Sequence, residues 1–389
     1  MTSWDDTHIL NDLRRCIRCT LPETHETIQF DEEGICNICR QHEFKKAKIN
    51  WNDKLEELKK LCDNYRGKGD YDCILPFSGG KDSTFTLWYI VEKLNLKPLV
   101  VSFDHGFYRS KLLENNERTI RKLGVDFLKF RIDWKLMKKI MLESFKKTGD
   151  FEWHAHVGTF AYPVQIAVKH KIPLIFWGEP SSEYTAYYTY DDNEDVNADR
   201  FSTLVNLGIS SENMLQYLGQ NYTVRDLSWS VYPSVDKLKE IGIRSIPLGS
   251  YIPWNVKNNF EIINKELGWE GDRVEGVPPI YPYEKIEYQL QGARDYAKFI
   301  KRGYARTTHL TSIDIRNGRM SREKASELIT NYEGKKPASL PYLLKILGID
   351  EQEWRDILQQ NSVAPYTHDF SNEKLDEPLL DMQSWFKET

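Results

Sequence analysis

The sequence lacks long apolar runs, although 40% of its 389 residues are hydrophobic. No stretch approaches the roughly 20 consecutive apolar residues that a membrane-spanning helix needs. The first ten residues, MTSWDDTHIL, are acidic and contain neither the basic nor the apolar region of a signal peptide. We therefore expect no membrane span and a cytoplasmic protein, with enough apolar residues for a full core in two or three domains.

The sequence also lacks an excess of positive charge. Lys and Arg number 53 against 58 Asp and Glu, so the formal net charge is −5. Proteins that mainly coat nucleic acid carry basic surfaces. We therefore do not expect nucleic acid to be a partner, although a local basic groove is compatible with this charge. Internal repeats and low-complexity segments are missing as well.

Cysteine is scarce, but four of the six cysteines occur before residue 40. CIRC and CNIC form two C-x2-C pairs that are separated by sixteen residues. Each pair can direct two thiolates toward one tetrahedral ion, so the spacing is typical of a structural zinc site. Four unrelated thiols or a catalytic dithiol are the alternatives, whereas Cys62 and Cys73 are expected in the core. The predicted Zn²⁺ ligands are Cys16, Cys19, Cys36 and Cys39.

From residue 72 onward, short apolar runs alternate with helical patterns. Strands are expected at 72–77, 97–103, 126–132 and 172–178, and helices at 83–94, 110–123, 134–147 and 158–170. This alternation predicts an α/β fold, a parallel sheet with helices on both faces. We divide the chain into a zinc-ribbon-like segment (1–50), an α/β domain (51–250) and a mostly helical C-terminal region (251–389).

The segment LPFSGGKDSTFTLW places a glycine-rich loop between a predicted strand and a predicted helix. It contains neither G-x-x-x-x-G-K-[ST] nor G-x-G-x-x-G. Amides at a helix N-terminus bind anions, and glycines let the backbone approach phosphate closely. Lys81 adds positive charge, and Asp82 is suited to hold a Mg²⁺ that bridges phosphates. An ordinary glycine turn capped by Ser83 is the alternative.

The loop resembles the PP-loop of the ATP pyrophosphatase superfamily, whose members split ATP into AMP and pyrophosphate. The resemblance implies that ATP lies across the carboxyl ends of the parallel strands. Asp104 follows the second predicted strand, and Gly178 and Glu179 follow the fourth; a solvated strand end is the alternative for both carboxylates. The predicted nucleotide-binding residues are Ser78, Gly79, Gly80, Lys81, Asp82, Ser83, Asp104, Gly178 and Glu179.

A longer series of motifs resembles the N-acetyl sugar amidotransferases of bacterial surface-polysaccharide and nonulosonic-acid pathways. The four-cysteine segment and SGGKDS are followed by IPLIFWGE and by KRGYARTTHLTSIDIRNGRMSREKA, in which DIRNGRM is the most specific part. The resemblance covers roughly residues 10–350. It implies adenylation of the acetamido oxygen of an N-acetyl sugar, free or nucleotide-linked, and attack by ammonia. It also implies that a separate glutaminase and a cyclase-like channel protein supply the ammonia.

Arginines gather in the C-terminal region, where Arg306, Arg316 and Arg319 are suited to bind pyrophosphate or an acidic or nucleotide group of the sugar. The alternative is a solvated helix face that pairs with Asp314 and Glu323. Arg322 is excluded as an ordinary first-turn helix residue. The residues to which we assign catalytic roles are Lys81, Asp82, Arg306 and Arg319.

WHAHVG, at 153–158, contains His154 and His156, which a strand or loop would direct toward one ligand. One of them could serve as a base for ammonium, although a structural or surface role is the more common one for a histidine. The tyrosine- and aspartate-rich segment 183–201 suits a substrate lid, an interface or a solvated loop equally well.

Two rival functions remain open at this point. The first is a PP-loop enzyme that modifies tRNA by thiolation, which the negative net charge disfavours. The second is a non-catalytic zinc-containing scaffold, which the intact SGGKDS loop disfavours.

Overall fold

Five parallel strands form the centre of the structure, in the order β3-β2-β1-β4-β5. The computed structural model describes residues 13–179 and 205–386. The strands are β1 (Cys73–Pro76), β2 (Pro98–Asp104), β3 (Asp126–Arg131), β4 (Leu174–Trp177) and β5 (Arg244–Pro247). The four predicted strands and the α/β class are confirmed. The strand β5 was not predicted because RSIP contains a single large apolar residue, Ile246, whereas β1 and β4 lie within longer apolar runs.

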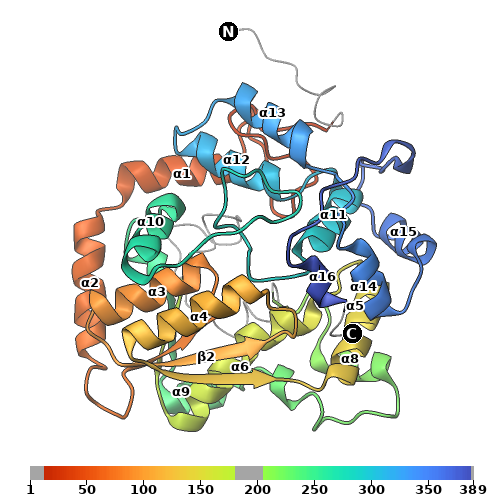
Figure 1. Cartoon of the computed structure of the whole chain (residues 1–389). Helices are drawn as coiled ribbons and strands as arrows, with labels where there is room; N and C mark the ends of the chain where they lie inside the picture. The colour runs from red at the N-terminus through yellow and green to blue at the C-terminus, as the bar shows by residue number, and fades with distance from the viewer. Residues whose placement is uncertain (1–12, 180–204, 387–389) are drawn as a thin grey trace.

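Helices cover both faces of this sheet (Figure 1). Leu75 and Val100, which are paired across β1 and β2, pack in one apolar cluster with residues of α3 and α4. Their neighbours Ile74 and Leu99 pack on the opposite face with residues of α6. Successive side chains of a strand alternate between faces, so continuous apolar strands require this double cover. The helices before β5 are α1 (Asn37–Lys48), α2 (Trp51–Asp63), α3 (Lys81–Glu92), α4 (Ser110–Leu123), α5 (Trp134–Thr148), α6 (Trp153–His170), α8 (Ser211–Leu218) and α9 (Val235–Ile241).

The C-terminal region is helical, as predicted, and it packs on the same core as the sheet. Trp354 and Tyr342 belong to one buried cluster with Phe103 of β2 and Phe107. The boundaries at 50 and 250 stay predictions. The helices are α10 (Val256–Leu267), α11 (Gln291–Arg302), α12 (Arg306–Arg316), α13 (Arg322–Tyr332), α14 (Leu340–Leu347), α15 (Glu351–Gln360) and α16 (Met382–Trp385). Short 3-10 turns occupy Ser228–Ser230, Leu248–Ser250 and Phe370–Asn372.

One local expectation was wrong. WHAHVG is neither strand nor loop, because α6 begins at Trp153. Residues two apart on a helix do not share a face, so the spacing of His154 and His156 does not direct both rings toward one ligand. The first 50 residues also contain a regular helix, α1, which begins inside the second cysteine pair. None of the described helices combines the length and apolar character of a membrane span.

The contact between α6 and β2 provides a test of the packing. An ideal Cβ at Gly158 of α6 would lie 2.3 Å from the ring of Phe103, and that ring is stacked on Trp229 at 5.1 Å. Gly158→Ala should therefore destabilise the fold by about 1–3 kcal/mol through overpacking, less about 1 kcal/mol of improved helix propensity. Urea unfolding would measure the change.

The matched control is Gly69→Ala, because an ideal Cβ at Gly69 meets nothing closer than 3.6 Å. This variant should unfold at nearly the wild-type urea concentration. A Gly158→Ala protein that is as stable as the control would contradict the close packing of α6 on β2.

Candidate active site and metal centre

The loop between β1 and α3 is folded tightly on itself. Gly79 has φ +85°, and a Cβ there would lie 1.9 Å from Oδ1 of Asn116, so only glycine fits. The Gly79 amide donates to Oγ of Ser83 at 3.1 Å, and the two hydroxyl oxygens of Ser78 and Ser83 are 3.2 Å apart. The N-cap residue of α3, Gly80, offers no side-chain acceptor. The first-turn amides therefore lack a side-chain cap, which suits an anion site.

A buried chain of alternating charges begins at this loop. Nζ of Lys81 lies 2.8 Å from Oδ2 of Asp82 and 2.7 Å from Oε2 of Glu284. The other oxygen of Glu284 lies 3.4 Å from Arg306, whose guanidinium is 3.3 Å from Asp295. The structure thus connects two of the predicted residues, Lys81 and Arg306, through a carboxylate that the sequence analysis missed.

The charge state of Glu284 follows from its partners. Burial would raise the pKa of this carboxyl, but the positive charges of Lys81 and Arg306 outweigh burial and lower it to about 2. Glu284 is therefore ionised at neutral pH. Its side chain is only 6% exposed, so it shares with Asp82 and Asp295 the charge compensation of Lys81 and Arg306.

A second carboxylate meets the loop from the end of β4. An ideal Cβ at Gly178 would lie 3.4 Å from Cβ of Asp82, so β4 ends against the first turn of α3. Burial raises the pKa of Glu179 to about 7, and the negative charge of Asp82 adds to the effect. Oδ1 of Asp82 is buried without a hydrogen-bond partner. Two neighbouring carboxylates, one with a free oxygen, suit a hard divalent cation such as Mg²⁺.

Asp104 ends β2 but is not a solvated strand end, because it is fully buried. Its Oδ2 lies 2.9 Å from Nζ of Lys129 and 2.8 Å from Nε of Arg131, and its Oδ1 accepts from the Gly106 amide at 2.8 Å. Burial opposes ionisation, but the bonds to Arg131 and Lys129 prevail and lower the pKa of Asp104. Asp104 thus holds the C-terminal end of β2 against β3 through its contacts with Lys129 and Arg131.

Arg319 is placed in a separate network. Its Nη2 lies 2.7 Å from Oδ1 of Asp314, and the other oxygen of Asp314 accepts from the Tyr281 hydroxyl at 2.9 Å and lies 3.2 Å from Lys257. The pairing with Asp314 was the alternative that we weighed for this arginine. However, Asp314 is buried, so this is an internal contact rather than a solvated helix face.

Another cluster of charged side chains surrounds the start of α6, and the sequence analysis missed most of it. Nε of Arg294, on α11, lies 2.7 Å from Oε2 of Glu152. Its Nη2 lies 3.3 Å from Asp150 and 2.6 Å from Nε2 of His156. The sequence offered a weak signal for this cluster, the adjacent charged residues Arg294 and Asp295 within the helical segment ARDYAKFIKR. Arg294 belongs to the Glu152 cluster, and Asp295 belongs to the Lys81 chain.

Burial sets the protonation of this cluster. It raises the pKa of Glu152 to about 7, although the charge of Arg294 acts in the opposite direction. Burial also lowers the pKa of His154 to about 4 and that of His156 to about 3, where the charge of Arg294 contributes. Both histidines are neutral at pH 7. The group that changes its charge near neutral pH is therefore Glu152. The segment 183–201 lies outside the described residues.

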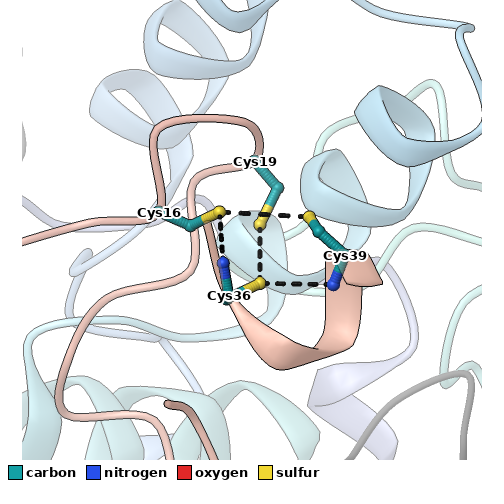
Figure 2. A group of neighbouring side chains, drawn as sticks. All are labelled: Cys16, Cys19, Cys36 and Cys39. Carbon is teal, nitrogen blue, oxygen red and sulfur yellow. Dashed lines mark hydrogen bonds between the residues drawn. The ribbon is translucent and has the colours of Figure 1, made fainter. Parts of the chain in front are cut away.

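The four predicted metal ligands converge at one point (Figure 2). All four Sγ atoms lie within 4.8 Å of one another, and all four residues are buried. The Sγ distances are 3.9 Å from Cys16 to Cys39 and 3.8 Å from Cys19 to Cys36. Four thiolates at about 2.3 Å from one tetrahedral ion would be about 3.8 Å apart. A disulfide needs about 2.05 Å, so the donor set fits a single tetrahedral metal ion.

The metal centre is attached to the C-terminal helices. Nη1 of Arg322, in the first turn of α13, donates to the carbonyl oxygens of both Cys16 and Cys19. The Thr20 hydroxyl lies 2.9 Å from that of Ser312 on α12. Arg322 was excluded from the arginines expected to bind phosphate or sugar, and these contacts give it a different, structural role. Its position in the first turn of α13 is confirmed, but its side chain supports the first cysteine pair.

The cysteine cluster leads to a prediction about metal content. The purified protein should contain about one metal equivalent per chain, and Cys36→Ser should lose most of it and unfold at a lower temperature, because three thiolates hold the ion poorly. Elemental analysis and thermal unfolding would measure both effects. Cys62→Ala is the control, since Cys62 is buried outside the cluster; a metal-free wild type would contradict the assignment.

The buried charge chain leads to a second prediction. Glu284→Gln leaves Lys81 and Arg306 without this counter-charge and should lower the free energy of unfolding by about 3–5 kcal/mol near pH 7. Glu284 has a folded pKa of about 2 against an ordinary value of 4.5, so its contribution is complete above 4.5 and is lost as the pH falls toward 2. The difference from wild type should therefore shrink by about 1 kcal/mol near pH 3.5.

Urea unfolding at the two pH values would measure this difference. Glu57→Gln is the matched control, because Glu57 forms an exposed pair with Lys54 and such pairs contribute about 0–1 kcal/mol. A Glu284→Gln protein as stable as this control would show that the charge chain is not required.

Comparison with known protein families gives a match in the C-terminal region. A family model for the LPS biosynthesis protein WbpG-like, C-terminal domain, matches residues 281–382. An uncharacterized protein of Methanocaldococcus jannaschii is 30% identical over 122 residues, which are 31% of this chain and 43% of the archaeal protein. This chain thus matches less than half the length of that relative.

Two solved structures are weakly similar. NMN synthetase from Francisella tularensis gives a TM-score of 0.28 at 13% identity, over 60% of this chain and all of that one. The U34-tRNA thiolase NcsA from Methanococcus maripaludis, with its [4Fe-4S] cluster, gives 0.32 at 11% identity over 93% and 94% of the two chains. Scores this low support no inference about function.

The matched segment contains the residues that meet the glycine-rich loop. Glu284 and Arg306, which complete the charge chain of Lys81, lie within it, and so does Arg294. Residues 281–382 therefore match the model for the WbpG-like C-terminal domain of lipopolysaccharide biosynthesis proteins, which supports the family resemblance drawn from the sequence.

Proposed function

We propose that this protein is an ATP-dependent amidotransferase that converts the acetamido group of an N-acetyl sugar into an acetamidino group. One observation carries the proposal: Glu284 and Arg306 of the lipopolysaccharide-biosynthesis segment join Lys81 of the SGGKDS loop in one buried network. A phosphate-type loop and a glycan-biosynthesis domain thus share a site. ATP and a sugar acceptor would meet there.

In the proposed reaction, the amide oxygen attacks the α-phosphorus of ATP, and the bond to the β-phosphate oxygen breaks. The first-turn amides of α3 and the ammonium of Lys81 hold the departing pyrophosphate. Arg306, which is held by Glu284 and Asp295, adds positive charge on the same side. The products of this step are pyrophosphate, which takes up the amide N–H proton, and the neutral imidate of the sugar, whose former amide oxygen carries AMP.

Two metal ions belong to the proposal. Asp82 and Glu179 would hold Mg²⁺, because their carboxylates adjoin and one oxygen of Asp82 has no protein partner. When bound, Mg²⁺ supplies charge neutralisation on the phosphates. The four-cysteine site would hold Zn²⁺ as a closed structural centre, because all four positions are filled by thiolates.

The second step joins nitrogen to carbon. An amide carbon resists attack because resonance with nitrogen reduces its reactivity, whereas AMP on the oxygen creates a good leaving group. Ammonia attacks the carbon, the carbon–oxygen bond breaks, and AMP leaves with the electron pair. A separate glutaminase and a channel protein would supply the ammonia. We place the reaction in the cytoplasm, in the biosynthesis of a bacterial surface glycan such as O-antigen or nonulosonic acid.

The proposal predicts AMP formation that depends on both acceptor and ammonium. The protein would be incubated with ATP, Mg²⁺, ammonium chloride and a panel of free and nucleotide-linked N-acetyl sugars. The converted sugar should be lighter by about 1 Da, because NH replaces O. Lys81→Ala should reduce AMP formation by about 10²–10³-fold, the usual effect of removing one charge-stabilising group.

Lys59→Ala is the matched control, since Lys59 is an exposed lysine of α2 paired only at the surface with Glu56, and it should keep wild-type activity. AMP formation that requires tRNA instead of a sugar would favour the thiolation alternative. A folded, metal-loaded protein that forms no AMP with any acceptor would overturn the proposal.

A further inference from the structure

We propose that Glu152 is the general base that takes a proton from ammonium at the amination step, held for that task by Arg294. This inference rests on the proposed function and assigns a residue that no motif in the sequence indicated. The cluster around Arg294 carries it, because this cluster is buried, lies at the carboxyl edge of the sheet and contains an arginine from the same segment as Glu284.

The position of Glu152 follows from the topology. Residue 152 directly precedes α6, and α6 ends just before β4 begins. In a parallel sheet, a helix that leads into a strand starts at the carboxyl edge. Side-chain contacts agree with this position, since Nε2 of His154 lies 3.4 Å from the carbonyl oxygen of His105, which follows β2. Glu152 is therefore at the edge that also carries the SGGKDS loop and Glu179.

The loop 278–290 connects Glu152 with the phosphate loop. Within it, Glu284 meets Lys81 at 2.7 Å, and an ideal Cβ on Gly80 would lie 3.0 Å from Glu287. Lys285, between these two glutamates, acts electrostatically on both Glu152 and Glu179. On α11, Arg294 binds Glu152 while the next residue, Asp295, binds Arg306. The two clusters are thus parts of one charged site.

The chemistry of Glu152 suits a base that acts near neutral pH. The groups that face it are Asp150, His156, Lys285, Tyr288 and Arg294. Because burial outweighs the attraction of Arg294, its pKa is about 7, close to the optimum for proton transfer at that pH. The two histidines of WHAHVG do not fill this role, since they remain neutral and His156 is within hydrogen-bond distance of Arg294.

The step balances as follows. The Glu152 carboxylate removes one proton from ammonium, which leaves ammonia and a protonated Glu152. The ammonia lone pair forms the new carbon–nitrogen bond, and the bond between the carbon and the AMP oxygen breaks with its electron pair on AMP. The products are an amidinium sugar and AMP. Glu152 then returns its proton to solvent. The path lies on the side of the half-buried His156, which is the more exposed of the two neighbouring side chains.

The test separates adenylation from amination. Exchange of labelled pyrophosphate into ATP, measured with the accepted sugar but no ammonium, reports adenylation alone. AMP release with ammonium reports both steps. Glu152→Gln should fold, because its amide oxygen can still accept from Arg294 and Asp150 still balances that charge. It should keep exchange within about threefold and lose about 10²–10⁴-fold in AMP release, the usual contribution of a general base.

The pH profile gives a second readout. Wild-type AMP release at saturating ammonium should level off above about pH 7 and fall below it, because Glu152 becomes protonated, whereas the residual rate of Glu152→Gln should rise steadily with the fraction of free ammonia and show no break near pH 7. Glu117→Gln is the control, since Glu117 is an exposed partner of Arg121 on α4. It should keep the rate and the pH limb of the wild type.

The outcomes distinguish the two proposals. Loss of both exchange and AMP release in Glu152→Gln, with the fold intact, would show that Glu152 acts in binding or adenylation and would overturn the inference. Unchanged AMP release would overturn it as well. A wild type that supports neither exchange nor AMP release with any acceptor would instead overturn the proposed function, and the role of Glu152 would be rejected with it.

Discussion

The buried ion pair between Lys81 and Glu284 joins two parts of the chain that are 203 residues apart in sequence. Lys81 begins α3 directly after the glycine-rich loop, and Glu284 comes from the loop that precedes α11. Each side chain is 6% exposed. Charges this well shielded from water are tolerable only when they are paired. The conformation of the phosphate loop and the position of the C-terminal region therefore depend on each other.

The metal centre extends this dependence to the N-terminus. Arg322 of α13 donates hydrogen bonds to the backbone of its first cysteine pair. Thr20, which directly follows this pair, lies within hydrogen-bond distance of Ser312 on α12. The helix α12 begins with Arg306, the residue that closes the charge chain through Glu284. The four-cysteine site, although distant in sequence from the phosphate loop, thus contacts the helix whose first residue, Arg306, joins the charge chain of Lys81. Figure 1 shows α12 and α13 beside the N-terminal segment and on the opposite side of the molecule from β2.

Burial raises the pKa of two carboxylates at the same edge of the sheet to about 7, but the charged groups beside them differ. Burial acts on both, but Glu179 is also affected by the negative charge of Asp82, whereas Glu152 is bound by the guanidinium of Arg294. Neighbouring carboxylates with a free oxygen favour a cation, whereas a buried carboxylate that is bound by an arginine and has a pKa near neutrality suits proton transfer. Environment thus gives the same side chain two different chemistries.

The sequence by itself determined the elements whose signals are local. Apolar runs and helical periods identified four of five strands and the parallel α/β class, SGGKDS identified the loop, and the C-x2-C spacing identified all four sulfur ligands. Only the tertiary structure decided which distant side chains meet these elements. Glu284, Glu152 and Arg294 carry no motif, because a charge network depends on distance and burial rather than on sequence spacing. The same reason explains Arg322, which is an ordinary helix-start residue in the sequence and a support of the metal centre in the fold.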